Sequence, residues 1–76
     1  MNNTRKISLF AIIDQLEDLM GILDEVLDEE KEYRDNMPKK LHGREHYERA
    51  DKACRYIDHA IENIEDAISN IIDAAE

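Results

Sequence analysis

The chain has 76 residues, which is enough for one domain. A domain this small rarely builds a core worth more than ~3–5 kcal/mol without a disulfide, a metal or a partner chain. Its one cysteine, Cys54, cannot form an internal disulfide, and no cluster of Cys and His has the spacing of a zinc site. The formal net charge of −9 disfavours direct binding to nucleic acid, because phosphates would be repelled.

The sequence also predicts a compartment. No apolar stretch approaches the ~18 residues that a membrane span requires, and no charged segment followed by an apolar one resembles a secretion leader. A single cysteine is typical of reducing compartments, where disulfides are rare. We therefore expect a cytoplasmic protein without membrane contact.

The first predicted helix covers about residues 4–35, with Thr4 as its expected N-cap. Apolar residues recur there at alternating spacings of four and three, which is typical of one face of a helix. These residues are Leu9, Ile13, Leu16, Met20, Leu23 and Leu27. A second row, Ile12, Leu19 and Val26, runs beside them together with Ile22. At ~100° per residue the two rows cover about half of the helix, so this helix needs two or more neighbours.

Residues 36–43 form the predicted connection, or tip, and the second predicted helix covers about residues 44–75. Pro38 disfavours helical geometry at Met37, so the first helix should end by about Asn36. In the second helix, apolar residues step by three and four from Tyr47 to Ala75. Four alanines recur beside them at every seventh residue, namely Ala53, Ala60, Ala67 and Ala74. This small row should pack against the bulky row of the first helix or of another subunit.

Two long helices joined by a short connection predict an all-α antiparallel helical hairpin, with residues 1–76 as a single domain. Apolar surface remains on one side of such a hairpin. We therefore expect self-association into a four-helix or larger bundle, with a homodimer as the favoured form. The expected interface residues are Ile12, Leu16, Leu19, Leu23, Val26, Ala53, Ile57, Ala60, Ile64, Ala67 and Ile71.

Charge is segregated along the chain. Residues 7–30 contain eight acidic residues and no basic one, and residues 56–76 contain six acidic residues and no basic one. Residues 31–55 contain eight basic and five acidic residues. In a hairpin, the basic block lies at the tip and the acidic segments form the stem.

The basic tip is the candidate ligand site. Lys39, Lys40 and Arg44 could neutralise a phosphate together with the free amides at the start of the second helix. Tyr33 and Tyr47 bracket the tip and could stack on a base. The expected ligand-binding residues are Tyr33, Arg34, Asn36, Lys39, Lys40, His42, Arg44 and Tyr47. In the alternative interpretations, the tip pairs with the acidic stem of a neighbouring subunit, or a partner protein docks on it.

The acidic residues raise two further hypotheses. Carboxylates one helical turn apart are ~5–6 Å from each other, so the stem could imitate nucleic acid; a solvated face is the simpler interpretation. The run Asp28-Glu29-x-x-Glu32 followed by Glu48-x-x-Asp51 resembles the carboxylates of all-α nucleoside triphosphate pyrophosphatases, which hold magnesium. Those side chains should point to solvent in this chain. We therefore expect no enzyme, no catalytic residue, no metal and no cofactor.

The tip as a whole resembles a known pattern. The residues that carry the resemblance are Tyr33, Asn36, Met37, Pro38, Leu41, Tyr47 and Glu48. They match the Tyr-x-x-Asn-hydrophobic-Pro-x-x-Leu tip of short acidic helical-hairpin proteins from phages and prophages of Firmicutes. The positive charges at Lys39, Lys40, His42 and Arg44 depart from that family's pattern.

The resemblance implies a phage source, and with it the host cytosol, but no activity. A viral source favours an anti-defence role. The leading hypothesis is an oligomeric, non-enzymatic binding protein that sequesters a phosphate-containing nucleotide signal at its tip. The alternatives are an acidic inhibitor or adaptor that blocks a host defence nuclease, and a purely structural helical bundle.

Overall fold

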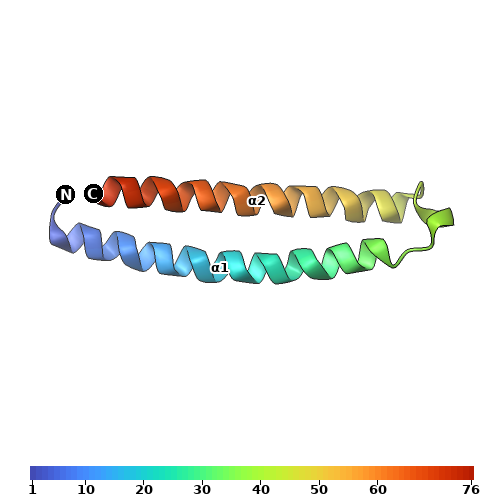
Figure 1. Ribbon diagram of the computed structural model, residues 1–76, viewed down its shortest axis with the longest axis horizontal. Helices are drawn as coiled ribbons and strands as arrows, with labels where there is room; N and C mark the ends of the chain where they lie inside the picture. Colours follow the sequence, from blue (N-terminus) through green and yellow to red (C-terminus); the bar gives the residue numbers. More distant parts are fainter.

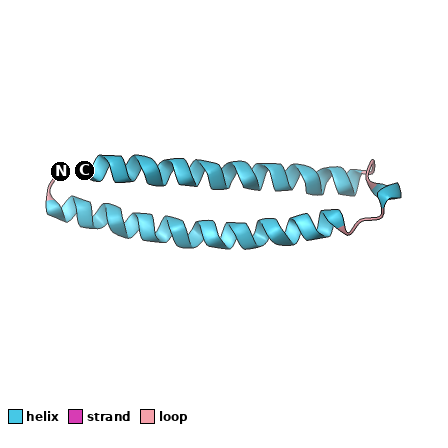
Figure 2. Ribbon diagram, viewed as in Figure 1, coloured by secondary structure: helices cyan, strands magenta, loops and turns pink.

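The computed structural model describes residues 1–76, which form two long helices and one short one. Helix α1 spans Asn3–Asp35, the 3-10 helix η1 spans Lys39–Leu41, and α2 spans Glu45–Ala75. The long helices lie side by side and antiparallel, with both termini at one end and the connection at the other (Figure 1, Figure 2). The predicted all-α hairpin is confirmed, and each predicted helix boundary lies within one residue of the observed one.

Helix α1 begins before Thr4 because Asn2 is its N-cap. Asn2 has an extended backbone, and its Oδ1 accepts a 2.9 Å hydrogen bond from the backbone N–H of Arg5. Asparagine is among the strongest N-capping residues, so the helix begins at the first position where such a cap is available. The prediction of Thr4 as the cap was wrong. Thr4 lies in the first turn, where its carbonyl oxygen accepts a hydrogen bond from the Ser8 hydroxyl.

The connection around Pro38 ends α1 as predicted. Asn36 is the C-cap, and its backbone N–H donates to two carbonyl oxygens of the last turn. Pro38 then adopts an extended conformation with φ −55° and ψ 144°, and η1 follows it. A second extended residue, Arg44 with φ −90° and ψ 158°, is the N-cap of α2. These two extended residues reverse the chain direction and define the tip.

The two long helices pack along a narrow apolar seam. The seven buried residues of the chain are Ile13 and Leu27 in α1 and Ala50, Cys54, Ile61, Ile68 and Ala75 in α2. Leu27, Cys54 and Ile61 form one contact cluster in this seam. Met20, Leu23 and Ile57 pack against the cluster. Two helices share only one contact line, so the core is a single row of interdigitated side chains.

The seam has two flanks, which the heptad positions identify. The seam residues occupy positions a and d of a heptad labelled a to g on each helix. Both helices are right-handed and run in opposite directions. Positions g and c of both helices therefore lie on one side of the hairpin, and positions e of both helices lie on the other.

The side with positions c and g carries no charge over most of its length, and it is termed the apolar face. It consists of Ile12, Gln15, Leu19, Ile22 and Val26 from α1 and Ala53, Tyr56, Ala60, Asn63, Ala67, Asn70 and Ala74 from α2. No charged residue interrupts these positions, although 38% of the chain is charged. Ile12, Leu19, Ile22 and Val26 are 43%, 55%, 55% and 44% exposed. The hairpin thus presents a continuous uncharged surface to solvent.

The middle of the opposite side, at positions e, is termed the acidic face; the same positions hold exposed Phe10 and Ile72 near the termini and Lys31 and Asp51 near the tip. It carries Glu17 and Asp24 from α1 and Asp58 and Glu65 from α2, all of them exposed. None of these four carboxylates takes part in an ion pair. The two sides of one hairpin therefore differ sharply in chemistry.

The hairpin exposes more surface than a compact protein of its mass. Its accessible area is 5814 Å², whereas a globular chain of 8.9 kDa exposes about 4,800 Å². Only seven residues are buried, while eleven large apolar side chains are at least 38% exposed.

Neither long helix has a segment apolar enough to cross a membrane.

Candidate functional site

The tip carries three cations without a partner. Lys39 and Lys40 lie in η1, Arg44 precedes α2, and all three side chains are exposed. None of them forms an ion pair. Their positive charges are therefore available to an anionic ligand.

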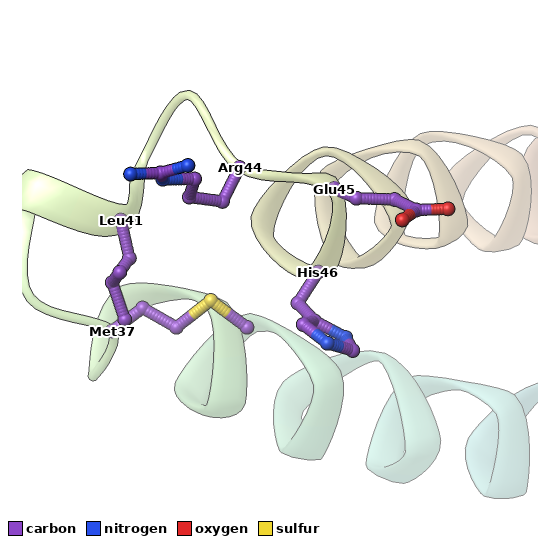
Figure 3. Close-up of a pocket in the computed structure, with 5 residues that line it drawn as sticks. All are labelled: Met37, Leu41, Arg44, Glu45 and His46. Atoms are coloured by element: carbon purple, nitrogen blue, oxygen red, sulfur yellow. The ribbon is translucent and has the colours of Figure 1, made fainter.

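An open pocket of about 440 Å³ lies where the tip meets α2. Its lining residues are Met37, Leu41, Arg44, Glu45 and His46. Figure 3 shows Arg44 extending toward Leu41 at the tip, His46 pointing toward α1, and Glu45 pointing away along α2. The pocket combines apolar walls with a guanidinium, an imidazole and the carboxylate of Glu45, which forms an ion pair with Arg49. Such a lining suits a ligand with a flat ring and an anionic group.

Arg34 is engaged within the chain. Its Nε donates a 2.9 Å hydrogen bond to Oδ1 of Asp35, and its Nη1 donates a 3.0 Å bond to Oδ1 of Asp51 on α2. The hydrogen bond to Asp35 is the main reason why the pKa of Arg34 lies above its ordinary value. The structure therefore places this predicted ligand residue in a bridge between the helices, away from the open pocket.

The aromatic residues of the tip have different environments. Tyr47 is half-buried, and its ring stacks on the ring of His42 with centroids 4.3 Å apart and planes at 20°. Nε2 of His42 lies 3.1 Å from the carbonyl oxygen of Met37, within hydrogen-bond distance. His42 and Tyr47 thus close the hairpin. Tyr33, 54% exposed, and the exposed Asn36 remain open to a ligand.

The start of α2 carries negative charge of its own. Glu45 and Glu48 stand in the first turn, where the helix dipole favours carboxylates. Glu45 also forms an ion pair with Arg49 one turn later. These carboxylates compete with an external anion for the free amides of α2. A phosphate at the tip would therefore depend on the two lysines and Arg44.

The predicted interface residues fall into two groups. Leu16, Leu23, Ile57, Ile64 and Ile71 are half-buried in the seam of the single chain. Ile12, Leu19, Val26, Ala53, Ala60 and Ala67 lie on the apolar face instead. Within the chain, both rows occupy position g and flank the seam on the same side, so the half-buried alanines of α2 lie beside the bulky row of α1. The second group is therefore the one that a partner can reach.

The carboxylates that resembled a pyrophosphatase site do not converge. Asp28, Glu29, Glu32 and Glu48 are exposed. Asp51 is bound to Arg34, and its Oδ2 lies 3.6 Å from Nε of Arg55. No three side chains of His, Cys, Asp or Glu are close enough together to hold a metal ion.

Burial raises the pKa of the Cys54 thiol, which packs in the seam as an apolar side chain.

Sequence reasoning missed part of the pocket and part of the apolar face. Met37 and Leu41 enter the sequence prediction only through the tip pattern, and Glu45 and His46 were not predicted to bind a ligand. Gln15, Asn63 and Asn70 were not predicted either, because apolar periodicity does not identify polar residues. They could have been found in the sequence as uncharged residues that recur at every seventh position.

The fold and these surfaces define a small two-helix protein with a basic tip, an apolar face and an acidic face. Comparisons with protein-family models, with curated proteins and with solved structures found no match. A function therefore has to be inferred from the chain's own surfaces.

Proposed function

We propose that this protein is a non-enzymatic binding protein that acts as a self-associated helical bundle, with a homodimer as the simplest form. The observation that carries the proposal is the apolar face. Leu19 and Ile22 are each 55% exposed in a chain that buries only seven residues. An exposed apolar patch of several hundred Å² is typical of an interaction surface. A bundle of hairpins would remove this patch from water.

Sedimentation equilibrium at micromolar concentration tests the association. We expect a mass that is a multiple of 8.9 kDa and a denaturation midpoint that rises with protein concentration. A compact monomer with a concentration-independent, cooperative unfolding transition would contradict the proposal.

In this proposal the tip captures a phosphate-containing ligand, and a nucleotide signal of bacterial defence is the candidate. The support is the group of unpaired charges at Lys39, Lys40 and Arg44 beside an open pocket with apolar walls from Met37 and Leu41. Exposed Tyr33 offers a ring for stacking on a base. The phage source and the anti-defence role rest on the resemblance of the tip pattern.

Titration calorimetry with a panel of cyclic and ADP-ribose-type nucleotides tests the ligand. The Lys39→Glu/Lys40→Glu variant should weaken binding on the order of tenfold or more, because charge-assisted hydrogen bonds to phosphate are lost. The matched control, Lys52→Glu/Arg55→Glu, makes the same change of net charge on the outer side of α2, outside the pocket lining. Equal loss in both variants, or no heat from well-folded wild type with any nucleotide, contradicts the ligand proposal.

The acidic face supports a second candidate function, an inhibitor or adaptor that blocks the basic groove of a host defence nuclease. The specific observation is that its four exposed carboxylates have no cation to neutralise them. An Asp24→Asn/Asp58→Asn variant should then lose inhibition of the nuclease, while Lys39→Glu/Lys40→Glu keeps it. The opposite pattern would favour the tip.

A further inference from the structure

We infer that the partner on the apolar face is a second copy of this chain, packed antiparallel so that each tip lies beside the termini of the other copy. This inference rests on the proposed self-association and specifies its surface and its orientation. The size of the apolar face, the match of its residues and the placement of charge support this arrangement.

The apolar face is large enough for a stable dimer. From Ala53 to Ala74 of α2 it is about 32 Å long at 1.5 Å per residue, and two helices side by side are about 20 Å wide. A second copy would therefore bury roughly 650 Å² on each chain, or about 1,300 Å² in total. Specific interfaces bury roughly 1,200–2,000 Å² in total. The face alone reaches this range.

Two symmetric arrangements bring the faces of two hairpins together. If the two-fold axis runs along the hairpin, the tips meet, and α1 of each copy packs on α2 of the other. If the axis crosses the hairpin, the copies are antiparallel, and α1 packs on α1 while α2 packs on α2. The residues on the face distinguish these arrangements.

The α1 residues match their own copies in the antiparallel arrangement. Leu27 and Ile57 pack together in the seam, so Ile22 on α1 lies roughly level with Asn63 on α2, at the middle of the span from Ala53 to Ala74. A two-fold axis at this level places Ile22 against the partner's Ile22. It also places Leu19 against the partner's Val26. The contact between the two α1 helices is therefore apolar.

The α2 residues match in the same arrangement. Ala60 lies against the partner's Ala67, and Ala53 lies against the partner's Ala74. Helix axes in packed pairs are about 8–10 Å apart, depending on the side chains between them. Because alanine is small, the axes of the two α2 helices can lie at the shorter distances of this range. The bulky rows of the two α1 helices require the longer distances. Asn63 meets the partner's Asn63, and an amide can both donate to and accept from another amide.

The tips-together arrangement creates mismatches. It places Ile22 against the partner's Asn63, so an amide would be buried on an aliphatic side chain without a hydrogen-bond partner. It also gathers both basic tips at one end, although residues 31–55 already hold eight basic and five acidic residues. The antiparallel arrangement separates the tips along a hairpin whose longest extent is 59 Å. Packing and charge thus favour the same orientation.

This orientation also determines how many ligands a dimer binds. The two tip pockets of a dimer lie at opposite ends, so each binds its ligand alone. The expected stoichiometry is one ligand per chain, with no site shared between the two tips.

The Ile22→Glu variant tests the surface. It places a carboxylate beside its own copy at the two-fold axis, and the dissociation constant should rise by about 100-fold or more. The matched control is Ile7→Glu, because Ile7 is 69% exposed at a position that points away from the apolar face. This control should change the dissociation constant by less than about threefold. If wild type dimerises and Ile22→Glu dimerises equally well, the surface is wrong while self-association stands. If wild type is a monomer, the proposed self-association itself fails.

Cysteine cross-linking tests the orientation. In a Cys54→Ala background, Asn63→Cys should give a covalent dimer on oxidation, because the two thiols meet at the axis. The control is Asp66→Cys, on the outer side of the same helix, which should not cross-link. Cys54 is only 2% exposed, so the experiment can also be run with Cys54 in place if the alanine variant loses helix content. A dimer in which Ile22→Cys cross-links to a partner's Asn63→Cys, and Asn63→Cys does not cross-link to itself, overturns the antiparallel orientation.

Discussion

The two long sides of the hairpin flank the same seam yet have opposite chemistry. The apolar face has no charged residue from Ile12 to Val26 or from Ala53 to Ala74. The acidic face has exposed carboxylates from both helices and no ion pair among them. Both sides are formed by the same two helices. Heptad position therefore decides what each side can contact, and local composition does not.

The difference also has a consequence for assembly. A second hairpin on the acidic face would bring like charges together, which is destabilising. Association is therefore directed to the apolar face. A protein with one associating side forms a closed two-fold dimer more readily than an open-ended assembly.

Two leucines give the sharpest contrast between the seam and the apolar face. Leu27 is 3% exposed and Leu19 is 55% exposed. Leu27→Ala should lower the free energy of unfolding by about 3 kcal/mol at every protein concentration, because it leaves a cavity. Leu19→Ala should change the stability of the monomer by less than about 0.5 kcal/mol. Its destabilising effect should appear only at concentrations at which the protein is associated. Urea unfolding at high and low protein concentration measures both losses. If the two losses depend on concentration in the same way, the seam and the face are not distinct.

Gly21 provides a change that belongs to neither side. It lies at an outward position of α1, and no heavy atom stands within 4 Å of where a Cβ would be. Gly21→Ala should raise the free energy of unfolding by about 1 kcal/mol, because alanine has the higher helix propensity. The dissociation constant of the dimer should not change. A fall in stability, measured by thermal unfolding, would mean that this surface is covered by another chain.

Asp58→Lys tests the repulsion on the acidic face. The new cation lies across the seam from Asp24, and the free energy of unfolding should rise by about 0.5 kcal/mol at low salt. The gain should shrink as sodium chloride is added, because the Debye length falls to about 3 Å at 1 M. Asp66→Lys makes the same change of charge on the outer side of α2 and serves as the control. Equal gains from both variants would assign the effect to net charge alone.

Some features of the tip could be predicted from sequence and others could not. Pro38 ends α1 through local sterics, so the position of the tip followed from the chain alone. The free charges of Lys39 and Lys40 were also predictable, since no acidic residue stands next to them. The bond between Arg34 and Asp51 was not, because the two residues are 17 positions apart and meet only when the hairpin closes.

The N-cap of α1 was missed for a different reason, since Asn2 and Thr4 are both competent caps and only one of them precedes the first turn.

The sequence by itself determined the helices, their boundaries and the rows of residues on each of them, because periodicity is a property of one helix. It also determined that the seam would hold Leu27, Cys54 and Ile61, since these residues lie at position a of the apolar repeat. Only the tertiary structure decided that the bulky row of α1 and the alanine row of α2 form one face. Antiparallel packing places the g positions of both helices on the same side, whereas parallel packing would place each g row beside an e row. The direction in which the helices pack therefore created the surface that the proposed dimer uses.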